Sequence, residues 1–104
     1  MAFCVVLVTA SSDEEAAKLA RLLVEGKLAA CVNQVPGVKS TYWWQGRIEE
    51  AREVLLIAKT SKEKVKALVK AVKKNHSYSI PEVVALRIKE GNRDYLRWIG
   101  ESLK

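Results

Sequence analysis

The chain alternates between short apolar runs and amphipathic stretches. Residues 3–8 are apolar and predict a buried strand. In the segment that follows, Ser11 and Ser12 each precede a glutamate at capping-box distance, which predicts a helix start. Apolar residues then recur with the helical period at Ala16, Leu19, Ala20, Leu23 and Val24. We expect this helix to end near Glu25, with Gly26 as its left-handed terminating residue.

A long β-hairpin is predicted next. Residues 28–32 and 38–44 read as one strand, with a break or bulge at Pro36-Gly37. Gln45-Gly46 supplies the turn, and residues 47–60 form the returning strand. Its segment 54–58 is apolar at every position, as in a sheet strand that is covered on both faces.

The remainder predicts a helix, a strand and a short terminal helix. Thr60, with Glu63 three residues on, is the expected cap of the first of these helices. Its buried stripe is Val65, Leu68, Val69 and Val72, and its lysines take the opposite face. Residues 76–82 form a loop and residues 83–88 a strand, after which Asn92 caps the last helix. That helix is expected to bury Tyr95, Leu96 and Ile99.

The order of elements is β-α-β-β-α-β followed by a helix. It predicts a ferredoxin-like α+β sandwich as one domain over residues 1–104, with a long β-hairpin and a C-terminal helix. Two helices would cover one face of the sheet and leave the other without a helical cover. The hairpin is too long for so small a domain, so its tip must protrude or contact a partner.

Composition narrows the class of protein. The net charge is +6, and the segment 62–74 alone holds six lysines against one glutamate. We interpret this as a solvated helix face and expect no specific nucleic-acid binding, because the segment 53–59 lacks the aromatic rings on which RNA-recognition sheets stack bases. We expect no membrane span and no signal peptide. Cys4 and Cys31 lie in apolar runs as reduced thiols, so a cytoplasmic location is expected.

Three consecutive aromatic residues mark a candidate interface. Tyr42, Trp43 and Trp44 precede the hairpin turn, and adjacent side chains on a strand point to opposite faces. At least one large ring therefore faces away from the domain's own core. We interpret this group as an oligomer interface, with a scattered exposed aromatic as the alternative.

The reactive and metal-binding residue types in the chain do not indicate catalysis. The chain has a single histidine and no nucleophile or phosphate-binding motif, so we predict that it is not an enzyme. A closed metal site is not expected, because the cysteines and His76 lack metal-ligand spacing. An open site built from His76, Glu82 and a cysteine such as Cys31 stays possible, since imidazole and thiolate suit copper or zinc. The alternative is a loop histidine that only forms hydrogen bonds.

Several motifs together resemble one known family. They are Leu28-Ala29-Ala30-Cys31-Val32-Asn33, Tyr42-x-Trp44-x-Gly46-x-Ile48, Glu53-Val54 with Lys59-Thr60, His76-x-Tyr78-x-x-Pro81-Glu82, and Tyr95-Leu96-x-Trp98. In this order and spacing the chain resembles the CutA family of divalent-cation tolerance proteins over almost its whole length. The resemblance implies a ferredoxin-like homotrimer that pairs its hairpins between subunits and takes part in the response to metal ions.

The resemblance also implies a ligand, and two residues of this chain depart from the family pattern. Copper or a similar divalent cation is the expected ligand, with no organic cofactor. Ser77 replaces the family's usual proline beside His76, and Val8 stands where some members have a cysteine. We therefore expect an open, partly hydrated site at His76 and Glu82, completed by Cys31 or another subunit. The alternative function is a trimeric interaction or signalling scaffold with incidental metal affinity.

Overall fold

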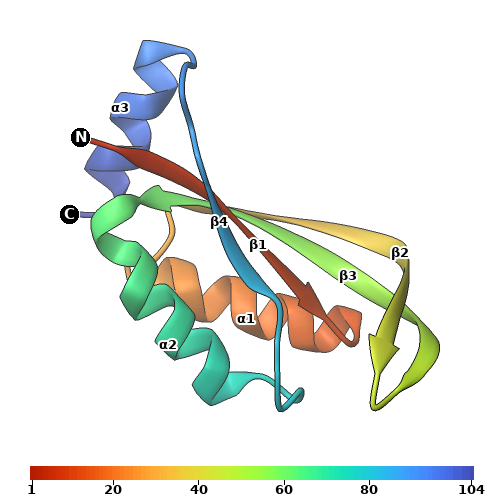
Figure 1. Ribbon diagram of the computed structural model, residues 1–104. Helices are drawn as coiled ribbons and strands as arrows, with labels where there is room; N and C mark the ends of the chain where they lie inside the picture. Colours follow the sequence, from red (N-terminus) through yellow and green to blue (C-terminus); the bar gives the residue numbers. More distant parts are fainter.

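The computed structural model describes residues 1–104 as four strands and three α-helices (Figure 1). The strands are β1 (Phe3–Ala10), β2 (Cys31–Trp44), β3 (Arg47–Ser61) and β4 (Val83–Arg87). The helices are α1 (Asp13–Glu25), α2 (Val65–Asn75) and α3 (Arg93–Ser102). A short 3₁₀ turn, η1 (Lys62–Lys64), precedes α2. This is the predicted β-α-β-β-α-β order with a C-terminal helix.

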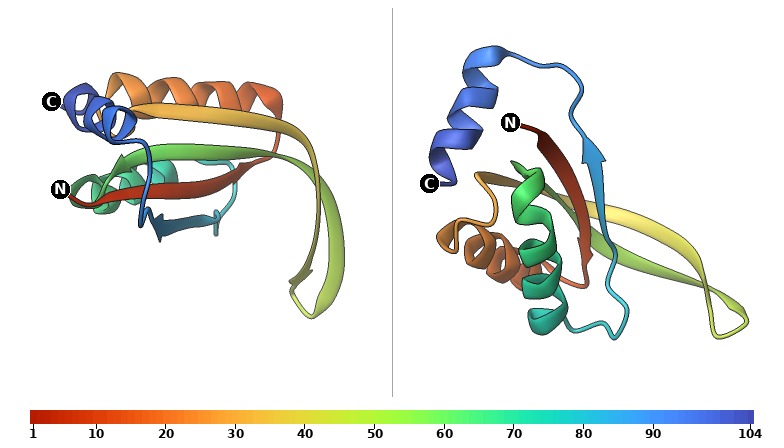
Figure 2. Two further views of the ribbon diagram at one scale, coloured as in Figure 1. Left: turned by 90° about the horizontal axis from the view of Figure 1, so that it is seen from above. Right: turned by 60° about the vertical axis from the view of Figure 1, so that its left-hand side comes forward.

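The strands form one antiparallel sheet in the order β2-β3-β1-β4. Helices α1 and α2 lie side by side on one face of it (Figures 1 and 2). Alternate residues of β1 and β3 point toward these helices and are fully buried, as are Leu19, Leu23, Leu68 and Val72 on the helices. Burial of this apolar surface is the main stabilising term of the fold. The ferredoxin-like α+β prediction is confirmed.

Helix α1 begins as predicted and ends slightly differently. The Ser12 hydroxyl accepts the Glu15 backbone N–H at 3.1 Å, and the Glu15 carboxylate accepts the Ser11 N–H at 2.9 Å. At the other end Gly26 has φ −79°, and Lys27 takes the left-handed conformation with φ 60°. The expected role of Gly26 therefore falls one residue later, because the N–H groups after Lys27 turn back to the Leu23 carbonyl.

The hairpin of β2 and β3 is long and bent. Its register shifts between Val35 and Val38, at the predicted bulge. The turn residues Gln45 and Gly46 both have positive φ, as a two-residue hairpin turn of the mirror-image type requires. Beyond the bulge the two strands curve away from the sheet as an arm of residues 38–52 (Figure 2). The structure begins β2 at Cys31 and not at Leu28, because residues 28–30 complete the turn after α1.

The prediction that Thr60 caps a helix is wrong. Thr60 lies within β3, opposite Cys4, and is fully buried. Its hydroxyl donates to the Leu28 carbonyl oxygen at 2.6 Å, so it ties the start of the β2 segment to β3. The chain then passes through η1, and α2 starts at Val65 without a side-chain cap. Strand pairing with β1 places Thr60 in the sheet, and the hydrogen bond to Leu28 then satisfies its buried hydroxyl, so this side chain is not available to cap a helix.

The terminal helix covers one end of the second sheet face. Asn92 caps α3 as predicted, through its side-chain oxygen and the Asp94 N–H. Ile99 is buried, but Tyr95 is 41% exposed and stacks on Trp98, so its predicted burial is wrong. On the same sheet face, Val84 and Leu86 of β4 stay exposed. No helix has the length and apolar character needed to cross a bilayer.

Candidate functional site

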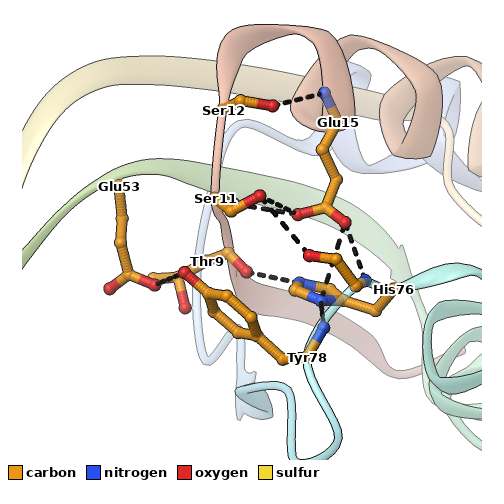
Figure 3. Close-up of polar contacts among 8 residues, drawn as sticks. Thr9, Ser11, Ser12, Glu15, Glu53, His76 and Tyr78 are labelled. Atoms are coloured by element: carbon orange, nitrogen blue, oxygen red, sulfur yellow. Dashed lines mark hydrogen bonds and ion pairs between the residues drawn. The ribbon is translucent and has the colours of Figure 1, made fainter.

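The side chain of His76 is the centre of a buried polar network (Figure 3). Its Nδ1 accepts the backbone N–H of Tyr78 at 3.0 Å, and its Nε2 lies 2.7 Å from the Thr9 carbonyl oxygen. An acceptor at Nδ1 and a carbonyl at Nε2 together require a neutral ring with its proton on Nε2. Both nitrogens are therefore engaged within the chain, and the ring ties the 76–82 loop to the end of β1.

Glu15 connects this loop to the start of α1. Its carboxylate accepts hydrogen bonds from the Ser11 N–H and hydroxyl and from the Ser77 N–H, and lies 3.9 Å from His76 Nδ1 (Figure 3). Burial by itself would raise the carboxyl pKa, but the hydrogen bonds from Ser11 and Ser77 outweigh it and lower the pKa from 4.5 to about 2. The ionised carboxylate thus connects the start of α1, the residues after β1 at Ser11 and the 76–82 loop at Ser77.

Tyr78 extends the network to β3. Its hydroxyl donates to Glu53 Oε2 at 2.8 Å, and its ring packs against that of His76 with centroids 4.7 Å apart. Burial and the Glu53 carboxylate raise the pKa of Tyr78, so the phenol stays protonated as the donor. Glu53 is only 8% exposed and directly precedes the buried part of β3.

A cavity of about 790 Å³ lies beside this network, between the hairpin arm and the 76–82 loop. Residues 40–44 of the arm and 78–80 of the loop line it, together with Thr9, Glu53 and Glu82. The three predicted interface aromatics Tyr42, Trp43 and Trp44 all belong to this lining. Two carboxylates and no basic side chain face the cavity, so it favours positively charged groups.

The predicted metal-site residues are not gathered in one chain. The side chain of His76 is buried and packs against Tyr78, Glu82 is exposed and lines the cavity, and Cys31 begins β2, where its Sγ lies 4.0 Å from Lys59 Nζ. Lys59 also donates to the Asn33 side chain. No group of three His, Cys, Asp or Glu side chains comes together.

Sequence reasoning missed Thr9, Glu15 and Glu53 as members of this site. Thr9 contributes only its backbone carbonyl, which no sequence pattern marks. Glu15 was assigned a capping role, which it has, and its second oxygen reaches Ser77, which lies 62 residues away in the chain. Two signals could have pointed to Glu53: it directly precedes the all-apolar segment 54–58, and Glu53-Val54 is one of the motifs of the family resemblance.

The lysine face of α2 gives a separate prediction about nucleic acid. Lys66, Lys70, Lys73 and Lys74 are exposed on this helix. We expect only weak binding of a labelled single-stranded RNA, measured by fluorescence polarisation, and a loss of about tenfold or more between about 50 and about 200 mM salt. Submicromolar, sequence-selective binding that persists at the higher salt would contradict a purely solvated lysine face.

The comparisons with known proteins agree with this architecture, a ferredoxin-like α+β fold with an extended hairpin. The family model "CutA1 divalent ion tolerance protein" matches residues 4–102. The chain is 51% identical to the divalent-cation tolerance protein CutA of Thermus thermophilus, over 94% of this chain and 95% of that protein. It is similar in structure to CutA1 of Oryza sativa, with a TM-score of 0.96 and 47% identity over 98% of this chain and 94% of that one.

The chain therefore belongs to the CutA family of divalent-cation tolerance proteins. It spans nearly the full length of the Thermus relative, but only 56% of the chloroplastic CutA 1 protein of Oryza sativa, to which it is 48% identical over 96% of its own length. The resemblance found in the sequence motifs is thus confirmed.

Proposed function

We propose that this protein acts as a homotrimer in the tolerance of divalent cations, without a catalytic step, in the cytoplasm. The observation that carries the proposal is the hairpin arm. Trp43 and Ile48 near its tip are 72% and 63% exposed, and Trp44 and Tyr42 are 40% and 41% exposed. Aromatic and apolar groups gathered on a protruding hairpin fit a surface that another copy of the chain covers.

A divalent cation such as copper is the proposed ligand of this assembly, bound in an open site near the 76–82 loop. Glu82 is exposed and supplies a carboxylate, and His76 supplies an imidazole if the cation replaces one of its two internal hydrogen bonds. Pro81 restricts the backbone directly before Glu82. Since one subunit lacks a third ligand, water or another subunit would complete the coordination.

Calorimetric titration with copper(II) chloride tests this site. We expect weak binding in the parent protein and about a tenfold loss of affinity in His76→Ala and in Glu82→Gln. Glu63→Gln, on the distant turn η1, is the charge-matched control and should bind as the parent does. Glu82 is exposed, so its substitution should leave the fold intact even where His76→Ala destabilises it.

If all three variants bind copper with the affinity and stoichiometry of the parent protein, the ligands lie elsewhere, and Cys4, Cys31 and the amino terminus are next to be examined.

The second candidate function is a trimeric interaction or signalling scaffold. It is favoured by the absence of three gathered ligands in one subunit. A protein that is trimeric but shows no saturable copper binding would support the scaffold.

A further inference from the structure

The cavity between the hairpin arm and the 76–82 loop has a lining unlike that of a metal cage. Two of its lining residues carry carboxylates, Glu53 and Glu82, and four are aromatic residues, Tyr42, Trp43, Trp44 and Tyr78. No lysine, arginine or histidine side chain lines it, although the chain as a whole carries a net charge of +6. A negative, aromatic cavity in a basic protein selects for a positive ligand.

Glu53 places a carboxylate in a fixed position at this cavity. Its Oε2 accepts the Tyr78 hydroxyl, which fixes the position of the carboxylate. The other oxygen has no hydrogen-bond partner within the chain, and no buried polar side-chain atom lacks a partner, so this oxygen is accessible to solvent on a residue that lines the cavity. A carboxylate on a residue that is 92% buried, with one free oxygen, is a strong acceptor for a charged N–H donor.

The size and apolar character of the cavity favour an organic cation over a bare ion. A volume of about 790 Å³ lies within the range of small-molecule sites. Aromatic rings attract ammonium and guanidinium groups through their π-faces and also cover the alkyl stem of such a ligand. A divalent metal gains little from these rings, and the carboxylates of Glu53 and Glu82 would leave most of its coordination to water or to groups outside the lining.

We propose that this cavity binds an organic cation, an alkylammonium or guanidinium group, with Glu53 as its anion and aromatic residues of the arm in its lining. Two sources supply that chemistry: a free small amine, or a lysine or arginine side chain from a second copy of this chain. The proposal does not depend on copper binding and goes beyond the proposed role in cation tolerance.

A titration with n-butylammonium chloride tests the free-amine source, with n-butanol as the neutral counterpart. The titration is followed by NMR. The chemical shifts of the Trp43 and Trp44 indole N–H groups report on the cavity, and that of Trp98 on α3 is an internal reference. We expect saturable shifts at the first two signals with butylammonium and none with butanol. Glu53→Gln, which keeps an acceptor for the Tyr78 hydroxyl, should lose about tenfold in affinity, and Glu63→Gln should lose nothing.

A different result is expected if the cation is a lysine or arginine side chain of a second copy of this chain. If a basic side chain of another copy fills the cavity, butylammonium will not bind the assembled protein. Glu53→Gln will then shift the assembly toward dissociation in analytical ultracentrifugation, while Glu63→Gln will not. No saturable butylammonium binding together with unchanged assembly in Glu53→Gln would overturn the proposal. Equal amine affinity in Glu53→Gln and the parent would overturn it as well. Copper titration is a separate measurement, so failure here leaves the cation-tolerance proposal standing.

Discussion

Trp44→Ala is expected to weaken self-association by about 3–5 kcal/mol and to shift the molecular mass toward that of a monomer. Trp44 ends β2 next to the hairpin turn and is 40% exposed in the single chain. Trp44 belongs to the lining of the cavity beside the arm and is not part of the hydrophobic core. If another subunit buries it, removing the ring deletes an aromatic anchor at the interface. Light scattering over a dilution series measures the change.

Trp98→Ala is the matched control for this experiment. Trp98 is 46% exposed, close to the value for Trp44, but it lies on α3 and stacks on Tyr95. Its removal deletes the same side chain from a surface away from the arm, so the mass should stay that of the assembly. A parent protein that is monomeric at micromolar concentration would refute the homotrimer. An unchanged assembly in Trp44→Ala would mean that this ring is peripheral to the interface.

The fold was predictable because local signals and the hydrophobic pattern agree along most of this chain. The bulge at Pro36-Gly37 and the turn at Gln45-Gly46 are marked by residues whose conformational preferences suit those positions. The two wrong predictions, the cap at Thr60 and the burial of Tyr95, both relied on a local pattern that tertiary packing overrides. Thr60 carried a capping pattern but was buried in β3, where the Leu28 carbonyl was its nearest partner. Tyr95 had helical periodicity, but the short α3 covers only one end of the sheet.

The site was only partly predictable for a related reason. The 76–82 loop was recognised because its histidine, aromatic, proline and acidic residues stand close together in the sequence. Its partners come from β1, α1 and β3, and the contacts that join them span 25 to 67 residues. No periodicity or motif reports a carbonyl oxygen such as that of Thr9. Tertiary packing, and not local sequence, gives His76 two hydrogen-bonding partners and makes it a structural centre.

The carboxylate of Glu15 is expected to make this protein sensitive to acid. Its pKa is lowered from 4.5 to about 2 in the folded chain, so the unfolded chain binds a proton more readily. The stabilisation is therefore complete above the unfolded value of 4.5 and is lost as the pH falls toward 2. Because the side chain is 12% exposed and partly screened, we expect a loss of about 2–3 kcal/mol in the free energy of unfolding.

Urea denaturation at one fixed protein concentration, repeated between about pH 7 and about pH 2, measures this loss. Glu15→Gln should be less stable than the parent near neutral pH by about 2 kcal/mol, because the amide keeps an acceptor but loses the charge-assisted hydrogen bonds. Its stability should change little over the window in which the parent's declines. Glu14→Gln, at the exposed neighbouring position, should follow the parent. If Glu15→Gln shows the parent's full acid-dependent decline, the carboxylate does not hold the 76–82 loop to α1 in the way its hydrogen bonds imply.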